Sequence, residues 1–462
     1  MKYISTRGEI NPVSFREAIM MGLARDGGLL IPEQIPDVTD RLVMWKKLSF
    51  VDLAFEIMRL YSDLPEEDLK KIVQSSYSKF DVKEITPVVP VDGVYILELF
   101  HGPTLAFKDV ALQFLGNLFE YILRESKQEL NILGATSGDT GSAAIQGVRG
   151  RKSMRIFVMH PHNRVSKIQE KQMTSVLDSN VYNIAIAGTF DDCQNIMKAI
   201  FCDLAFKDKY SLGSINSINW ARVLAQIVYY FYSAFRVMEI TGAEKIRFSV
   251  PTGNFGDIFA GYVACRMGLP VNGLVLATNE NDILARFFNT GEYSLGTVVE
   301  TLSPSMDIQV ASNFERFLYY KLGENTALLK QLMLSFSKTG KLNVKKDECG
   351  LISRTIVAGS SDTESTLSTI RNFYNEYGYI LDPHTAVGVN VALRHKIERE
   401  PMICLATAHP AKFSDAIKRA TGMDIAHHPS IDALEGMPTK CESLPASVAA
   451  VRDYIETRIA AN

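Results

Sequence analysis

The sequence predicts an α/β protein with two open, mostly parallel βα domains and a mainly helical N-terminal domain. Three observations lead to this fold class. The first 90 or so residues consist mostly of helical patterns. From Val94 onward, short apolar runs alternate with amphipathic helical segments, which is typical of βα units on a parallel sheet. Most of these runs are followed at once by Gly, Pro, Ser, Thr or His, so polar loops gather where ligands bind in open α/β sheets.

The length and composition exclude several classes of protein. A chain of 462 residues corresponds to two or three domains at roughly 150 residues per domain. The formal net charge of −3 gives no basic excess for nucleic acid or an anionic membrane. Val223–Phe235, the most apolar stretch, is shorter than the roughly 20 residues that cross a bilayer, and it predicts a buried helix.

The cysteines and the N-terminus indicate where the protein functions. The six cysteines are scattered without CxxC pairs, and the first residues lack the apolar segment of a secretory signal. We therefore expect the reducing cytoplasm. His160, His162, His427 and His428 lack Cys or carboxylate neighbours at zinc-site spacing, so no metal site is expected.

The elements follow in a regular order. Residues 1–92 form the predicted N-terminal domain, with a turn at Asp26–Pro32, a helix at Pro65–Ser75 and then an extended stretch. Residues 93–462 form two lobes, the smaller around 130–220, with an elaboration around 280–350. The predicted strands are Val94–Leu99, Leu130–Leu133, Arg155–Met159, Val181–Ile186, Ile246–Val250, Gly273–Ala277 and Ile403–Thr407, and the elaboration has predicted helices at Asn313–Leu322 and Thr326–Ser337.

Lys108 is the first residue that points to chemistry. A turn at Gly102–Pro103 and a possible N-cap at Thr104 predict a helix that runs to Glu120. In that helix Lys108 falls on the apolar stripe. An ammonium among apolar neighbours loses hydration, so its pKa falls and the neutral amine can act as a nucleophile or base. The alternative is a surface lysine whose stem extends to solvent.

Two strand-to-helix loops are shaped for anions. One runs from Thr136 to Thr140, and the other contains Gly253 and Gly256. Free backbone N–H groups at a helix N-terminus favour a negative charge. Neither loop matches the P-loop or GxGxxG patterns. With Lys108, the two loops predict a phosphorylated cofactor and an anionic substrate, although each loop alone could be an ordinary capped turn.

Further polar residues occur at predicted loop positions. Thr407 places a hydroxyl at the end of a strand, where a satisfied core threonine is the alternative. Basic and polar side chains gather around Arg164 and Ser166, a pattern that a solvated surface would also give. Asn219 could cap the apolar helix that follows it.

These segments resemble the threonine synthase family, within the fold type II group of pyridoxal-phosphate enzymes. The chain contains, in the family's order, "DGGLLIP", "HGPTLAFKD", "ATSGDTGSAA", "NSIN", "VPTGNFGD", "SPSMDI", "SNFERF" and "ATAHPAKF". The resemblance covers nearly the whole chain. One departure is Lys167, where the family often has proline.

The resemblance implies pyridoxal 5'-phosphate as cofactor and a role for each matched residue. Lys108 would form the Schiff base, and Thr407 would face the pyridine nitrogen. The cofactor phosphate would lie on Gly253, Asn254, Phe255, Gly256 and Asp257. The substrate α-carboxylate would lie on Thr136, Ser137, Gly138, Asp139 and Thr140, and the substrate phosphate on Arg164, Ser166, Asn219 and Arg222.

The implied reaction converts O-phospho-L-homoserine and water to L-threonine and phosphate by γ-elimination and β-addition of water. Such an enzyme is a carbon–oxygen lyase of amino-acid biosynthesis whose partner is a small-molecule substrate. We expect neither nucleic acid nor a membrane as partner, and a monomer or homodimer. Two alternatives stay open: a phospholyase-like homologue that releases a 2-keto acid, and a non-catalytic ligand-binding homologue.

Overall fold

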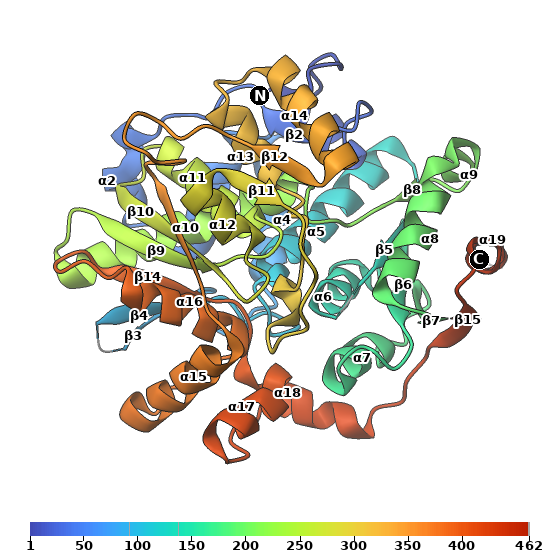
Figure 1. Cartoon of the computed structure of the whole chain (residues 1–462). Helices are drawn as coiled ribbons and strands as arrows, with labels where there is room; N and C mark the ends of the chain where they lie inside the picture. The colour runs from blue at the N-terminus through green and yellow to red at the C-terminus, as the bar shows by residue number, and fades with distance from the viewer. Residues whose placement is uncertain (92, 137, 461–462) are drawn as a thin grey trace. The chain divides into compact units, whose positions relative to one another are not determined.

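The computed structural model describes residues 1–91, 93–136 and 138–460. It divides into two compact units (Figure 1). The first unit contains Met1–Ala111 and Ser217–Ala426, and the second contains Leu112–Asn216 and His427–Asn462. Residues 1–92 fall within the first unit, and their boundary as a separate domain stays a prediction.

The first unit is built on a six-stranded sheet with the order β13-β10-β9-β14-β4-β3. All neighbouring pairs are parallel except β3 and β4. The strands are β3 (Val88–Val91), β4 (Val94–Glu98), β9 (Ile246–Pro251), β10 (Val271–Thr278), β13 (Ile356–Ser360) and β14 (Met402–Ala406). The four strands predicted here are confirmed, and β13 was missed because only part of its short run is buried.

The second unit contains a five-stranded parallel sheet with the order β15-β7-β6-β5-β8. Its strands are β5 (Leu130–Ala135), β6 (Met154–Pro161), β7 (Val181–Ala187), β8 (Leu212–Gly213) and β15 (Glu442–Pro445). The three predicted strands are confirmed. The edge strand β15 has no buried residue and therefore no apolar pattern that could reveal it.

The N-terminal part of the first unit contains a small antiparallel sheet and four helices. β1 (Tyr3–Ser5) pairs with β2 (Leu30–Pro32). The helices are α1 (Phe15–Met21), α2 (Leu42–Trp45), α3 (Phe50–Met58) and α4 (Glu66–Tyr77). The predicted helix at Pro65–Ser75 is confirmed as α4.

The remaining helices surround the two sheets (Figure 1). In the first unit they are α10 (Trp220–Thr241), α11 (Gly256–Arg266), α12 (Ile283–Thr290), α13 (Phe314–Lys321), α14 (Thr326–Thr339), α15 (Thr363–Tyr377), α16 (Pro383–Arg394) and α17 (Ser414–Thr421). In the second they are α6 (Asp139–Val148), α7 (Lys167–Thr174), α8 (Phe190–Cys202), α9 (Leu204–Lys209), α18 (Pro429–Asp432) and α19 (Val448–Ala460). α5 (Lys108–Ser126) begins in the first unit and continues into the second.

The helix α10 confirms the prediction of a buried helix. Every residue from Trp220 to Phe235 is buried, because α10 packs against α3 and α11. The predicted elaboration contains α13 and α14, as expected, and also a two-stranded antiparallel sheet of β11 (Glu292–Ser294) and β12 (Lys341–Asn343).

Each sheet has its own apolar core. The first unit's cluster includes Val275, Val389 and Cys404, all buried between strands and helices α15 and α16. The second unit's cluster includes Phe157, which stacks on Tyr182 with ring centroids 4.7 Å apart. These cores fix the strand ends that carry the candidate site.

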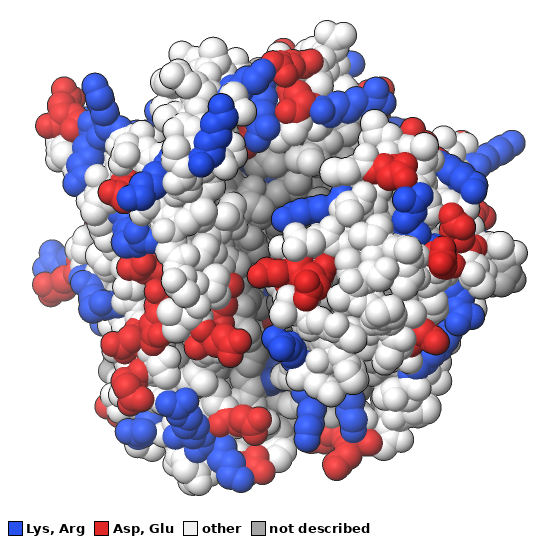
Figure 2. Space-filling view, turned by 45° about the vertical axis from the view of Figure 1, so that its right-hand side comes forward, with Lys and Arg blue, Asp and Glu red and all other residues white. Residues whose placement is uncertain are grey.

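The exposed surface carries charges of both signs. Figure 2 shows Lys and Arg side chains interspersed with Asp and Glu, in keeping with the small net charge. Within the described residues, no helix combines the length and apolar character needed to cross a membrane.

Candidate active site

Lys108 is buried at the start of α5, as its register predicts. The residue is 7% exposed, and its Nζ donates a hydrogen bond of 3.3 Å to Ser305 Oγ. Nζ also lies 5.3 Å from the centroid of the Phe107 ring. The Lys108 amine is thus shielded from bulk water, with the Ser305 hydroxyl and the Phe107 ring beside it.

The N-cap predicted at Thr104 is wrong, because α5 begins only at Lys108. The Thr104 hydroxyl and backbone N–H instead donate to the two oxygens of Asp109, each at 2.8 Å. Burial raises the pKa of Asp109 to about 6, although these bonds and the charge of Lys412 oppose the rise. Lys412 Nζ donates to the Thr104 carbonyl at 2.7 Å. These contacts fix the segment that leads into Lys108.

The predicted phosphate loop of the first unit joins β9 to α11. Phe255 has φ of 64°, in the left-handed region that side chains rarely adopt. Its buried ring stacks on Phe288, with centroids 6.0 Å apart and an interplanar angle of 4°. A Cβ on Gly253 would lie 2.7 Å from the Ser305 carbonyl oxygen. Packing thus holds a strained loop whose backbone N–H groups begin a helix, an arrangement suited to an anion.

One face of α10 packs against this loop. Arg222, Gln226 and Tyr229 share the face, since they are spaced four and three residues apart. Gln226 Oε1 lies 3.9 Å from the position of a Cβ on Gly256, and Tyr229 donates to Asp257. The cluster brings a buried cation near the start of α11.

Arg222 lacks the partners that a buried guanidinium normally has. The residue is 5% exposed, and no described residue accepts a hydrogen bond from Nε or Nη1. Burial lowers the pKa of Arg222 to about 10. Because leaving buried charged donors unpaired is costly, a bound anion is the partner that this geometry lacks. The residues present therefore fit a phosphorylated ligand.

Thr407 lies directly after β14, with an available hydroxyl. Its carbonyl accepts a bond of 2.8 Å from the Phe107 N–H, and its own N–H donates to Thr385 Oγ1 at 3.2 Å. Among the described residues, no hydrogen bond involves the Thr407 hydroxyl. The backbone thus ties Thr407 to the residue before Lys108, while its side chain stays available to a ligand.

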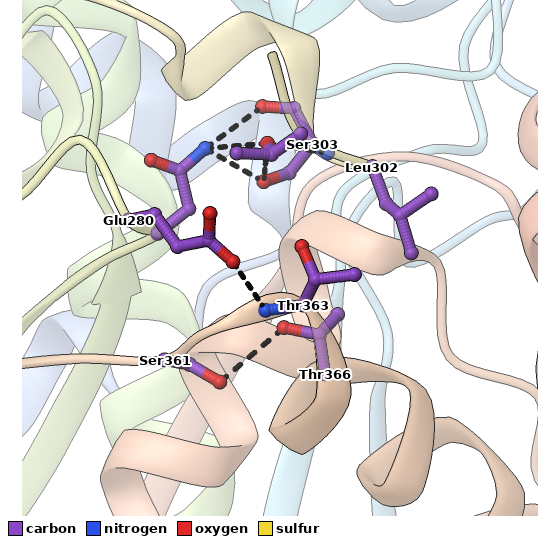
Figure 3. Close-up of a pocket in the computed structure, with 8 residues that line it drawn as sticks. Glu280, Leu302, Ser303, Ser361, Thr363 and Thr366 are labelled. Atoms are coloured by element: carbon purple, nitrogen blue, oxygen red, sulfur yellow. Dashed lines mark hydrogen bonds between the residues drawn. The ribbon is translucent and has the colours of Figure 1, made fainter. Parts of the chain in front are cut away.

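The loop that carries Ser305 is held by polar side chains (Figure 3). Asn279 Nδ2 donates to Ser303 Oγ at 3.0 Å and to Thr301 Oγ1 at 2.8 Å. On the other side of this pocket, Glu280 accepts from the Thr363 N–H at 2.7 Å. The hydrogen bonds drawn in Figure 3 thus support the loop that leads to Ser305.

Asn219 caps α10, as the sequence predicts. Its Oδ1 accepts from the Ala221 N–H at 3.1 Å, and its Nδ2 donates to the Ile19 carbonyl at 2.8 Å. The residue is fully buried. Both ends of the amide are thus used within the fold, and its contact with a substrate phosphate stays a prediction.

The predicted carboxylate loop of the second unit connects β5 to α6. Thr136 Oγ1 accepts bonds from the N–H groups of Gly138 at 3.0 Å and Gly141 at 2.9 Å. The threonine hydroxyl thus occupies two backbone donors that the sequence pattern alone would leave to an anion. Thr140, in the first turn of α6, is half-buried. Ser137 lies outside the described residues.

Gly138 has a conformation that only glycine adopts readily. Its φ is 148°, and a Cβ would lie within 2.4–2.8 Å of the Gln169 amide group. Gln169 Nε2 in turn donates to Asp139 Oδ1 at 2.9 Å. A close approach by Gln169 therefore requires the glycine.

Gln169 also connects the loop to the predicted phosphate ligands. Ser166 caps α7 by accepting from the Gln169 N–H at 3.2 Å, and its hydroxyl donates to Gln169 Oε1 at 3.1 Å. Arg164, two residues earlier, is exposed. The structure thus joins Asp139 and Ser166 through one amide, which the sequence analysis missed although Ser-x-x-Gln is a capping-box pattern.

The structure therefore groups the predicted residues within each unit. Ser305 contacts Lys108 and lies against Gly253, while Thr407 is tied to the segment before Lys108. In the second unit, Thr136, Gly138, Asp139 and Ser166 form one bonded group. Ser305 carries no sequence signal beyond its position in the "SPSMDI" segment.

Three protein-family models match successive parts of the chain. "Threonine synthase N terminus" matches residues 2–77, "Pyridoxal-phosphate dependent enzyme" residues 80–328, and "Threonine synthase, C-terminal" residues 385–455. The second alone spans more than half of the sequence.

Individual relatives match over almost their whole length. Threonine synthase of Schizosaccharomyces pombe is 47% identical over 91% of this chain and 89% of its own. Threonine synthase of Pseudomonas aeruginosa is 45% identical, with 98% of each chain covered. The crystal structure of PLP-bound threonine synthase from Brucella melitensis is similar with a TM-score of 0.95 at 43% identity, covering 99% of both chains.

Proposed function

The chain belongs to the threonine synthase family of pyridoxal-phosphate-dependent enzymes, and on that premise we propose that it converts O-phospho-L-homoserine and water to L-threonine and phosphate. One observation carries the proposal at the level of the site. The amine of Lys108 is buried against Ser305, whose carbonyl packs on the glycine loop that begins α11.

Pyridoxal phosphate fits the residues of the first unit. The backbone N–H groups from Gly253 to Asp257 would hold its phosphate, with the positive end of α11 behind them. Thr407 would offer its hydroxyl to the pyridine nitrogen. A hydroxyl carries no charge, so it does not favour a proton on that nitrogen as a carboxylate would.

The chain's own contribution to the reaction is mostly the movement of protons. When bound, pyridoxal phosphate supplies an electron sink for carbanion chemistry. Lys108 would take one proton from the substrate Cα and one from Cβ as phosphate leaves Cγ, and it would return one of them to Cγ. After water has added at Cβ, it would return the other to Cα. An amine that both takes and returns protons works best with a pKa near the working pH, which the buried setting of Lys108 supports.

The substrate's two anionic groups would be bound by separate sets of residues. We propose that the loop from Thr136 to Thr140 binds the α-carboxylate. Arg164, Ser166, Asn219 and Arg222 would receive the phosphate. The exposure of Arg164 and the unpaired buried donors of Arg222 support these roles.

A visible spectrum with and without O-phosphohomoserine, combined with threonine detection, tests the proposed function. We expect a yellow protein, a spectral change on addition of the substrate, and threonine as product. Accumulation of ammonia and a 2-keto acid without threonine would favour a phospholyase-like homologue. A cofactor-free protein without a spectral response would favour a ligand-binding homologue.

The cellular location and the oligomeric state are separate parts of the proposal. We propose a cytoplasmic enzyme that acts as a monomer or homodimer on a small-molecule substrate. Fractionation of cells and sedimentation velocity of the purified holoenzyme test the location and the oligomeric state.

A further inference from the structure

Ser305 makes three contacts with different parts of the candidate site. Its hydroxyl accepts the 3.3 Å hydrogen bond from Lys108 Nζ. Its N–H donates to His384 Nε2, also at 3.3 Å. Its carbonyl oxygen lies where a Cβ on Gly253 would approach to 2.7 Å. The position of this one residue therefore affects both the lysine and the phosphate loop.

The bonds of His384 define its tautomer. Because Nε2 accepts from Ser305, the proton is assigned to Nδ1, which donates to Asp382 Oδ1 at 2.9 Å. Both residues are buried, with His384 4% and Asp382 1% exposed. Asp382 also caps α16 and accepts from the His384 N–H at 2.9 Å. The Asp382 carboxylate thus holds His384 at both its ring and its backbone N–H.

The same carboxylate reaches a second part of the site. The Thr385 hydroxyl donates to Asp382 Oδ2, and that hydroxyl accepts from the Thr407 N–H at 3.2 Å. A single buried group at the start of α16 therefore supports both Ser305 and Thr407.

We propose that Ser305 is a catalytic residue that orients the Lys108 amine through its hydroxyl, and that His384, held by Asp382, is the residue that positions Ser305. The inference rests on the proposed function of Lys108. Ser305 Oγ can accept an N–H from either the amine or the ammonium form of the lysine. The proton that moves during the reaction passes between Lys108 and the substrate carbon, and the serine keeps its own proton throughout.

The first test compares Ser305→Ala with Ser303→Ala, the same change two residues earlier in the same loop. Ser303 bonds to Asn279, so its loss perturbs the loop without removing the Ser305 hydroxyl that accepts from Lys108. In full-length protein before addition of cofactor, modification of Lys108 by acetic anhydride is followed by mass spectrometry as a function of pH. Ser305→Ala should move the midpoint down by about one pH unit, because a buried ammonium loses an acceptor. Ser303→Ala should leave the midpoint unchanged.

The holoenzyme provides a second readout. We expect Ser305→Ala to lower kcat by about tenfold to a hundredfold with KM within about twofold, since orientation of the amine matters in the transition state. Equal midpoints and equal kcat in the two serine variants would overturn the inference.

Two variants of His384 that differ in one hydrogen-bond acceptor test its role. His384→Gln keeps an acceptor for the Ser305 N–H, whereas His384→Leu does not. The glutamine variant should keep a midpoint near that of wild type, and the leucine variant should behave like Ser305→Ala. If the leucine variant does not fold, Asp382→Asn takes its place in the comparison with the two serine variants. A glutamine variant as impaired as Ser305→Ala would remove His384 from the proposal.

Failure of this inference can be told apart from failure of the proposed function. Borohydride reduction of wild-type holoenzyme should attach the cofactor to Lys108. Attachment to another lysine would overturn both proposals. Attachment to Lys108, with unchanged behaviour of Ser305→Ala, would overturn only the role of Ser305.

Discussion

The Tyr229 hydroxyl donates a 2.5 Å hydrogen bond to Asp257 Oδ1, in the first turn of α11. Tyr230 donates to the same oxygen at 2.9 Å, and no described residue bonds to Oδ2. Burial raises the pKa of Asp257 to about 6, even though both tyrosines stabilise the carboxylate. A carboxyl group that is readily protonated interferes less with a phosphate at the same helix N-terminus.

Asp257→Asn should make stability less dependent on pH. Since the folded-state pKa is about 6 against an ordinary value of 3.8 for aspartate, the folded protein binds the extra proton between these two pH values. The protonated group therefore contributes about 3 kcal/mol to the free energy of unfolding below about pH 4. This contribution is lost as the pH rises to about 6. Urea unfolding of Asp257→Asn from pH 4 to 7 should show a flatter profile. The exposed Asp453 serves as control, and Asp453→Asn should keep the wild-type slope.

Lys108→Ala should abolish threonine formation while leaving the fold intact. The side chain is the proposed proton carrier, and its truncation removes a buried amine together with its hydrogen bond to Ser305. We expect a loss of at least about a thousandfold in kcat, with unchanged circular dichroism. Borohydride reduction of wild type should label the peptide that contains Lys108. Wild-type turnover by the alanine variant would exclude covalent catalysis by this residue.

Arg222 and Arg316 are both buried, and their replacement by leucine should act in opposite directions. Arg222 has two unpaired donors, so Arg222→Leu should raise the free energy of unfolding by about 1–3 kcal/mol in phosphate-free buffer. Arg316 donates to the Leu30 and Ile218 carbonyls, and its loss should cost about 3 kcal/mol or more.

The response of stability to inorganic phosphate should also differ between the Arg222 and Arg316 variants. Wild type should gain stability as phosphate is added, because phosphate binds the folded state. Arg222→Leu should lose most of that gain, whereas Arg316→Leu should keep it. A phosphate response that survives Arg222→Leu would contradict an anion-binding role for Arg222.

Gly138→Ala should destabilise the second unit by about 1–3 kcal/mol, because φ is 148° and the new Cβ would overlap Gln169. Gly134 in β5 is the matched control, since a Cβ there meets nothing within 4 Å. Thermal unfolding of the two variants measures the difference. Equal unfolding temperatures would show that the Gly138 loop can rearrange around a side chain.

Arg164→Ala should raise KM for the phosphorylated substrate by about tenfold or more, because a charged contact to phosphate is lost. Retention of the cofactor, followed by its absorbance after dialysis, should change little. Lys167→Ala removes a neighbouring exposed cation and should have a smaller effect on KM. If substrate KM and cofactor retention change equally, Arg164 is not a substrate-phosphate ligand.

Local sequence predicted much of the fold and several features of the site. The strands at Val94, Ile246 and Ile403 carry short apolar runs, and each is a strand in the structure. Asn219 lies directly before an apolar helix and caps it. Lys108 falls on an apolar stripe and is buried. These features depend on residues within one or two turns of each other, so periodicity and capping rules reveal them.

Other features depend on residues far apart in the chain. Glu442–Pro445 becomes a strand only because β7 offers an edge, and its own sequence has no apolar pattern. Thr104 does not cap α5, because the helix begins only at Lys108 and the Thr104 hydroxyl donates to Asp109 instead.

The sequence by itself determined the βα units, the cap at Asn219 and the burial of Lys108, since local periodicity and side-chain chemistry encode them. Only the tertiary structure decided that Ser305, 197 residues from Lys108, accepts its hydrogen bond, and that His384 holds Ser305. Such partners are chosen by how strands and loops pack in three dimensions, and no spacing along the chain records that choice.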